Sequence, residues 1–268
     1  MKNKSLIGFA SVFCTYFLIS CTKESSQKNT SELKYSINKR DLKGSLLAYI
    51  KDERSPKFCV VSIGGDRIAR MANEVRLNIE ISMDKWFDIA KEHRSWPEPN
   101  KRLNIQFSFS QGSTEDCDRF TNIFVWTYEH KSDFEKIGTK IERSHAVVLF
   151  SLNDPLKAMI HLQPGDEYGD AIVGHELGHA LGLGDTYKED GYIEGGLPQP
   201  PSSMNGESDD VDFDGYPSLN PSQDDYEGIH AILDYYEGRA TFCREGYKVD
   251  STVKVKPGFD LAFCAKKE

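Results

Sequence analysis

The sequence predicts an α/β domain in which a mixed, mostly parallel sheet is crossed by one long helix. Three observations lead to this fold class. An apolar run at residues 58–63 ends in two glycines, a helical repeat follows at residues 66–93, and several strand-like segments come after it. Strands and helices in this order predict a sheet with helices packed on its faces. The contents of 38% hydrophobic and 28% charged residues are ordinary for a globular domain.

The first strand and the long helix differ in the period of their apolar residues. Residues 58–63 form a continuous apolar run closed by Gly64 and Gly65, which is typical of a buried strand. In the next segment the apolar residues recur at steps of three or four, so they share one face of a helix. These residues are Ile68, Ala72, Val75, Ile79, Met83, Trp86 and Ala90.

The later strands are separated by polar, turn-rich stretches. Strands are expected at residues 103–109, 122–128 and 145–152, and a further short strand is expected at residues 158–162. Residues 187–221 are rich in Gly, Pro and Asp, so this segment is expected to be irregular.

Two more helices are marked by their end signals. One is expected at residues 170–181, where Gly182 or Gly184 would end it. The last helix is expected to begin at Ser222, with Asp225 three residues later as a capping-box partner.

Residues 1–20 have the pattern of a secretory signal. A short positive region precedes the apolar residues 6–19, a stretch shorter than the ~20 apolar residues that span a bilayer. The boundary before Cys21 resembles the bacterial lipoprotein signal, in which this cysteine receives a diacylglycerol; the alternative is an uncleaved N-terminal anchor. We expect a polar tether at residues 21–44 and a folded domain at residues 45–268. Both alternatives place the domain in the cell envelope, held at a membrane and facing the periplasm or the exterior.

The cysteines outside the signal and the tether are consistent with export. Four remain, an even number that suggests two disulfides with three possible pairings. We favour Cys243–Cys264, which would hold the C-terminal tail, and this leaves Cys59–Cys117. A cysteine-bound metal is disfavoured because no two of these cysteines have the Cys-x-x-Cys spacing.

The net charge of −9 argues against nucleic acid as a partner. Nucleic-acid binding requires clustered Lys and Arg to neutralise phosphates, and no long run of these residues occurs after residue 40. We expect a monomer that acts on proteins or peptides.

Residues 175–179, His-Glu-Leu-Gly-His, are the strongest functional signal in the chain. On a helix, His175 and His179 lie one turn apart and face the same way, so both imidazoles can reach one zinc ion. Glu176 can then act as the general base that takes the proton of a water activated by zinc. The alternative is a surface helix that carries this pattern by chance.

The residues that follow make a chance match less plausible. Gly182 comes three residues after His179, and Asp185 comes three residues after Gly182. A glycine in the left-handed conformation would end the helix and turn the chain back, so that Asp185 could become the third ligand. Three protein ligands and one open position are the arrangement of catalytic zinc.

This extended motif resembles that of the metzincin metallopeptidases, and aspartate in the third position resembles their snapalysin branch. The resemblance implies a twisted mixed sheet, a long helix, an active-site helix, an irregular methionine-turn segment and a C-terminal helix. It also implies a methionine beneath the metal, for which Met204 in Ser-Ser-Met-Asn-Gly is the candidate. Residues 220–231 resemble the helix that ends matrix-metalloproteinase-type domains.

One feature departs from the family pattern. Some metzincins carry a tyrosine two residues after the methionine, where this chain has Gly206. The oxyanion of the tetrahedral intermediate would then need another donor besides zinc, and Tyr187 is a candidate for which packing is the alternative role.

A second candidate metal site is formed by Asp210, Asp212 and Asp214, which precede a glycine as in the first half of an EF-hand calcium loop. Pro221 occupies the position of the last ligand, so a complete EF-hand is excluded, and a solvated acidic loop is the alternative to a structural calcium ion. His145, His161 and His230 are isolated in the sequence and fit ordinary packing or surface roles.

The sequence therefore predicts a zinc-dependent endopeptidase of extracytoplasmic proteins. Two alternatives remain open: a binding lipoprotein with a zinc site of weak catalytic activity, and an aspzincin-type peptidase. The intact Glu176 favours catalysis over binding. The close spacing of Asp185 to His179 and the presence of Met204 favour the metzincin type over the aspzincin type.

Overall fold

The fold was obtained as a computed structural model. It describes residues 34–38, 45–52, 54–97, 103–136, 145–149, 157–163, 170–184, 204, 220–238, 243–244, 246–256 and 259–267. The elements in chain order are β1 (Lys34–Asn38), α1 (Leu46–Lys51), β2 (Lys57–Ile63), α2 (Asp66–Lys91), β3 (Gln106–Gln111), β4 (Ile123–Tyr128), α3 (Lys131–Glu135), β5 (His145–Leu149), β6 (Lys157–Leu162), α4 (Asp170–Leu181), α5 (Gln223–Tyr236), β7 (Tyr247–Lys256) and β8 (Phe259–Lys266).

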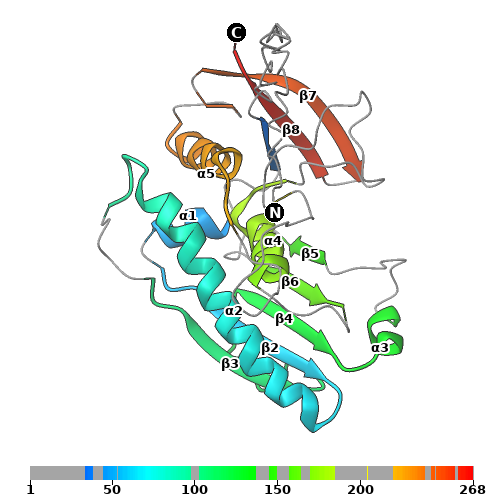
Figure 1. Cartoon of the computed structure of the whole chain (residues 1–268). Helices are drawn as coiled ribbons and strands as arrows, with labels where there is room; N and C mark the ends of the chain where they lie inside the picture. Colours follow the sequence, from blue (N-terminus) through cyan, green and yellow to red (C-terminus); the bar gives the residue numbers. More distant parts are fainter. Residues whose placement is uncertain are drawn as a thin grey trace, which may run out of the picture. The chain divides into compact units, whose positions relative to one another are not determined.

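The main sheet has five strands in the order β3-β2-β4-β6-β5 (Figure 1). The first four strands are parallel, and β5 pairs with β6 in the antiparallel direction. The expectation of a mixed, mostly parallel sheet is therefore confirmed. The four parallel strands begin within three residues of the ranges expected from the sequence.

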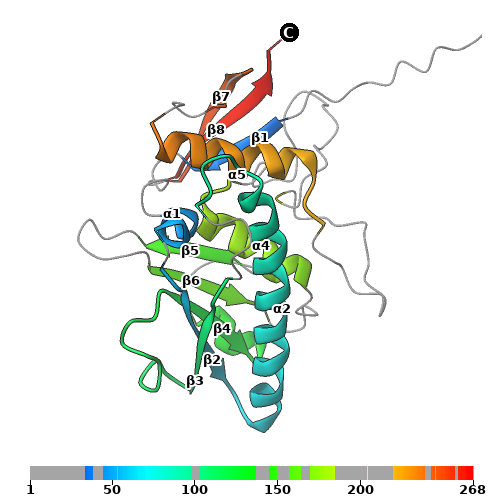
Figure 2. The same cartoon turned by 90° about the vertical axis from the view of Figure 1, so that its left-hand side faces the viewer.

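One face of this sheet forms the core with two helices. The register places Val60, Val125 and Ile160 side by side on the face, and none of the three is exposed. The 26-residue helix α2 packs along the sheet (Figure 2), and it also contacts α4, which packs on β5 and β6. The predicted apolar stripe of α2 is buried from Ala72 to Ala90, as one helix face against a sheet requires.

A second sheet joins the two ends of the described chain. It has the order β1-β8-β7, with both pairs antiparallel, and α5 packs on β1. The strand β1 lies within residues 21–44, where we expected a polar tether. Its sequence signal is weak, since it consists only of a short alternation of polar residues with Tyr35 and Ile37. Its pairing could not be read locally, because its partner β8 is at the opposite end of the sequence. The β7–β8 hairpin was also not expected.

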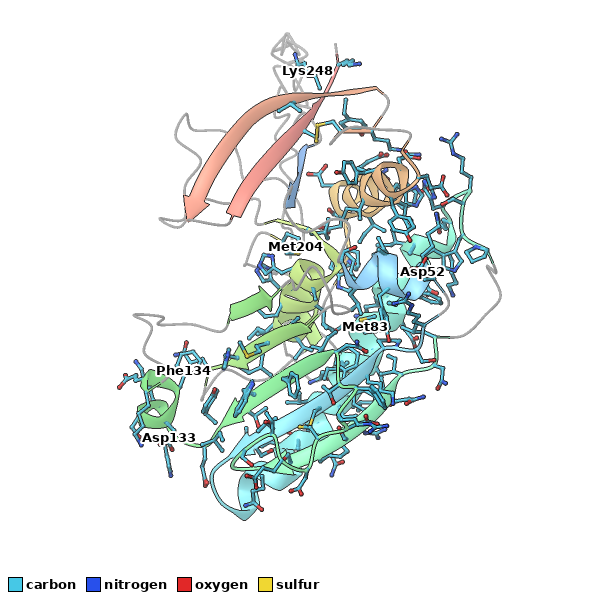
Figure 3. The ribbon with its side chains drawn as sticks, turned by 180° about the vertical axis from the view of Figure 1, so that it is seen from behind. Asp52, Met83, Asp133, Phe134, Met204 and Lys248 are labelled. Carbon is cyan, nitrogen blue, oxygen red and sulfur yellow. A yellow bond between two sulfur atoms is a disulfide. The ribbon has the colours of Figure 1, made fainter. Side chains whose placement is uncertain are left out.

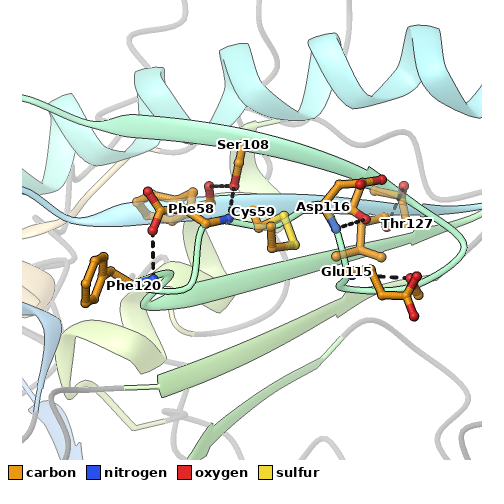
Figure 4. Close-up of a disulfide and its surroundings, with 12 residues drawn as sticks. Phe58, Cys59, Ser108, Glu115, Asp116, Phe120 and Thr127 are labelled. Atoms are coloured by element: carbon orange, nitrogen blue, oxygen red, sulfur yellow. Dashed lines mark hydrogen bonds between the residues drawn. A yellow bond between two sulfur atoms is a disulfide. The ribbon is translucent and has the colours of Figure 1, made fainter.

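Two disulfides hold these sheets, and both pairings are those favoured by the sequence. Cys243–Cys264 connects the segment after α5 to β8 and is seen as a yellow bond in Figure 3. Cys59–Cys117 connects β2 to the loop between β3 and β4 (Figure 4). Hydrogen bonds hold the same loop, among them one of 3.3 Å from the Asp116 amide to Ser110 Oγ.

The predicted end signals of the helices are also found. Helix α4 spans the predicted range, and α5 begins after Ser222 with a capping box. In this box Ser222 Oγ accepts from the Asp225 amide at 3.4 Å, and Asp225 Oδ2 accepts from the Ser222 amide at 2.8 Å. No helix among the described residues is long and apolar enough to cross a bilayer.

Buried polar groups tie α5 to the end of α2. His93 Nε2 lies 3.1 Å from Asp234 Oδ1, and His230 Nε2 donates to the Ile89 carbonyl at 3.1 Å. The two imidazoles meet edge to face, with ring centres 4.9 Å apart. Burial lowers the pKa of His230 to about 4, and burial also lowers the pKa of His93. This contact between the helices therefore depends on two neutral imidazoles.

Candidate metal centre

Helix α4 carries the two predicted histidine ligands one turn apart. The ring centres of His175 and His179 are 4.9 Å apart, and the ring planes are nearly perpendicular at 87°. Two imidazoles on one tetrahedral zinc ion, with Zn–N bonds of about 2.1 Å, have ring centres about 5 Å apart. The separation of these two side chains therefore fits a shared ion of this type. Glu176 follows the first ligand and is only 4% exposed.

A backbone carbonyl fixes the tautomer of His179. Its Nδ1 lies 3.1 Å from the carbonyl oxygen of Leu183. Because a carbonyl can only accept, Nδ1 carries the hydrogen and Nε2 keeps its lone pair. Histidines that bind metals usually have the other ring nitrogen held in this way, which orients the ring and raises its basicity. His179 is thus oriented to bind a metal through Nε2.

The same carbonyl is positioned by the turn that ends α4. Gly182 has φ of 109°, a value that favours glycine, as we predicted for this residue. Its amide donates to the His179 carbonyl at 3.0 Å, and the Leu183 amide donates to the Gly178 carbonyl at 3.0 Å. These are the two hydrogen bonds of a Schellman turn. The turn folds Leu183 back onto the helix and brings its carbonyl to His179.

Met204 packs directly against the turn of α4 that carries His175 and His179 (Figure 3). It is 1% exposed. A Cβ atom added at Gly178 would meet Met204 Sδ and would lie 3.1 Å from Met204 Cε. It would also lie 3.5 Å from Cζ2 of Trp86 on α2. A side chain at this position would therefore require Met204 to move.

Trp86 makes a second contact with α4 that sequence reasoning missed. Its indole Nε1 donates to the Gly174 carbonyl at 2.9 Å, immediately before His175. The apolar repeat of α2 identified Trp86 only as a core residue. A signal was nevertheless present, since Gly174 and Gly178 are spaced by one turn and leave a bare stripe on α4.

The remaining predicted site residues lie outside the described part of the chain. These are Asp185, Cys21, Tyr187, Gly206 and the aspartates Asp210, Asp212 and Asp214. Within the described ranges no group of three His, Cys, Asp or Glu side chains could hold a metal ion. Only two of the three expected zinc ligands belong to those ranges.

The isolated histidines occupy other parts of the fold. His161 is buried on β6, and its Nδ1 lies 2.7 Å from the hydroxyl oxygen of Tyr128. His230 is buried on α5, in the contact with α2. His145 lies on β5, in register with His161.

Comparisons with known proteins add no further assignment. No family model matches the chain, no curated protein matches it, and no solved structure matches it.

Proposed function

We propose that this protein is a zinc-dependent endopeptidase of metzincin type that hydrolyses peptide bonds of extracytoplasmic proteins. His175 and His179 bind the metal, and Asp185 completes the set of ligands. The observation that carries the proposal is the pair of imidazoles one turn apart, 4.9 Å between ring centres, with His179 held at Nδ1 by the Leu183 carbonyl. The contact between Met204 and Gly178 supports the metzincin type.

Each residue of the site has a separate part in the reaction. Bound zinc would supply a charge that polarises the scissile carbonyl and lowers the pKa of a water towards ~7. Glu176 takes the proton from the attacking water at its carboxylate and passes it to the departing amine. The Leu183 carbonyl holds the Nδ1 proton of His179, so that this imidazole keeps one orientation through the reaction.

The experiment separates metal binding from proton transfer. Protein purified without added metal should contain about one zinc per chain, and His179→Ala should lose it. Glu176→Gln should keep the zinc and lose at least ~100-fold in kcat on a peptide-library substrate, because an amide cannot accept the proton.

The control for Glu176→Gln is Glu135→Gln, which alters an exposed carboxylate on α3 and should leave zinc content and activity unchanged. A wild-type rate in Glu176→Gln would exclude Glu176 as the base. Iron or no metal in the purified wild type would contradict the zinc assignment.

The same experiment separates this proposal from its alternatives. A zinc-containing binding lipoprotein would hold the metal with no activity in the wild type, and an aspzincin-type enzyme would keep its zinc after Asp185→Ala.

We also propose that acylated Cys21 attaches the domain to the bilayer. A diacylglycerol together with an N-acyl chain is sufficient for stable attachment.

A further inference from the structure

We propose that Trp86 is a positioning residue for the metal ligands and that its indole N–H sets the rotation of α4 about its own axis. The inference rests on the zinc site proposed above and names a residue of another helix on which that site depends.

Trp86 lies against α4 at two positions one turn apart. Its Nε1 donates to the Gly174 carbonyl at 2.9 Å, and its Cζ2 lies 3.5 Å from the position of a Cβ at Gly178. Each glycine immediately precedes one of the histidine ligands, His175 or His179. One rigid ring therefore hydrogen-bonds the backbone beside His175 and occupies the space next to Gly178, beside His179. The hydrogen bond to the carbonyl adds a direction that packing alone does not supply.

Small rotations of α4 about its axis move the imidazole nitrogens of His175 and His179 by a large distance, because these atoms lie far from the axis. The ends of side chains lie about 6 Å from a helix axis, so a rotation of about 10° moves an imidazole nitrogen by about 1 Å. Metal–ligand distances must hold to within about 0.2 Å. A rotation of α4 by a few degrees is tolerated by apolar packing but not by metal binding. The Trp86 hydrogen bond therefore has to hold the rotation of α4 to within a few degrees.

Trp86 is itself held firmly enough for this role. It is 1% exposed and lies on the buried stripe of the 26-residue helix α2, which packs on the main sheet. At the C-terminal end of α4, the Leu183 carbonyl orients His179. The α4 backbone is thus fixed from α2, and the His179 ring is fixed from the turn that follows.

The test is Trp86→Phe, which removes the N–H donor and keeps an aromatic ring. We expect zinc affinity, measured by competition with a chelator, to fall by about 10- to 100-fold, as for other residues that orient ligands. The visible absorption bands of the cobalt-substituted protein should change, because they report ligand geometry. The far-ultraviolet circular dichroism of the metal-free protein should remain that of the wild type.

The matched control is Trp126→Phe. The buried indole nitrogen of Trp126 has no hydrogen-bond partner among the described residues, so this variant loses the same atoms without losing a donor contact. It should leave zinc affinity and the cobalt spectrum unchanged. If Trp86→Phe does not fold, benzothienylalanine incorporated at position 86 provides the second variant. It replaces the N–H by sulfur, keeps the shape of the indole, and should give the same loss of affinity.

The outcomes are distinguishable. Wild-type zinc affinity and an unchanged cobalt spectrum in the position-86 variants would overturn this inference while leaving the zinc proposal intact. A wild-type protein that binds neither zinc nor cobalt would overturn the zinc proposal and this inference with it. An equal loss of affinity in Trp126→Phe would show a general packing effect and would also overturn the inference.

Discussion

Gly178, between the two histidines of the candidate site, is packed closely against Met204 and lies next to Trp86. In the sequence it occupies an undefined position between the two histidines, and nothing there indicates what it touches. In the fold it separates Met204 from Trp86, which come from distant segments. The ligand types and their spacing were predictable from the sequence because they are local. The neighbours of Gly178 were not, because tertiary packing selects them.

The contact between Gly178 and Met204 can be tested with a double-mutant cycle. Gly178→Ala should lower the free energy of unfolding by about 1–3 kcal/mol, because the added Cβ meets Met204 Sδ. In a Met204→Ala background the same change should cost less, since the obstructing sulfur is gone. Urea denaturation of the four proteins would measure the coupling. Additivity within about 0.5 kcal/mol would mean that the two residues do not meet.

At the scale of single elements, helix ends were predicted well and the strands of the small sheet β1-β8-β7 were not. Gly182, Ser222 and Asp225 act within one turn of their own position, so their signals are complete in the local sequence. Strand β1 carries only a five-residue alternation and depends on β8 for its hydrogen bonds. Hairpin β7–β8 has bulges near Ser251 and Lys256, which interrupt the alternation that would have indicated it.

The turn that ends α4 provides a prediction at this scale. Gly182→Ala places a side chain at φ of 109°, so the Schellman turn should distort and the Leu183 carbonyl should leave His179. We expect a loss of about 1–2 kcal/mol in stability and a weaker affinity for zinc. Zinc titration with a competing chelator and thermal melts would measure the two effects.

The control for this variant is Gly238→Ala. Gly238 follows the end of α5 at φ of 72° with open space around it, so it also has a positive φ but lies away from the histidines. It should lose stability without any loss of zinc affinity. Equal losses of zinc affinity in the two variants would contradict a specific role for the α4 turn.

At the scale of the whole molecule, the contact between α2 and α5 makes stability depend on pH. The pKa of His230 is about 4 in the folded protein and about 6.5 in the unfolded chain. Between these values the unfolded chain binds a proton that the folded chain does not. The free energy of unfolding should therefore fall as the pH is lowered from about 6.5 to about 4, by about 3 kcal/mol from this residue. His93 acts in the same direction.

The variant His230→Gln tests this dependence, because glutamine keeps a donor for the Ile89 carbonyl and does not titrate. Between pH 7 and pH 4.5, urea denaturation should show a loss of stability about 2 kcal/mol smaller in the variant than in the wild type. If the proposed zinc is bound, its release affects both proteins alike and cancels in the comparison. His130→Gln changes an exposed histidine and should follow the wild type. Parallel curves for His230→Gln and the wild type would refute the assignment.

The pairing of β1 with β8 has a mechanical consequence. A pull on the chain ahead of Lys34 loads β1 first, and its short ladder can open one residue pair at a time from Lys34 towards Asn38. Strand β8 stays in place because Cys264 is bonded to Cys243. Releasing the five residues of β1 adds about 17 Å of extensible chain, at about 3.4 Å per residue. A pulling force would thus first extend the released β1 segment at the small sheet, and only then act on the helix that carries the histidines.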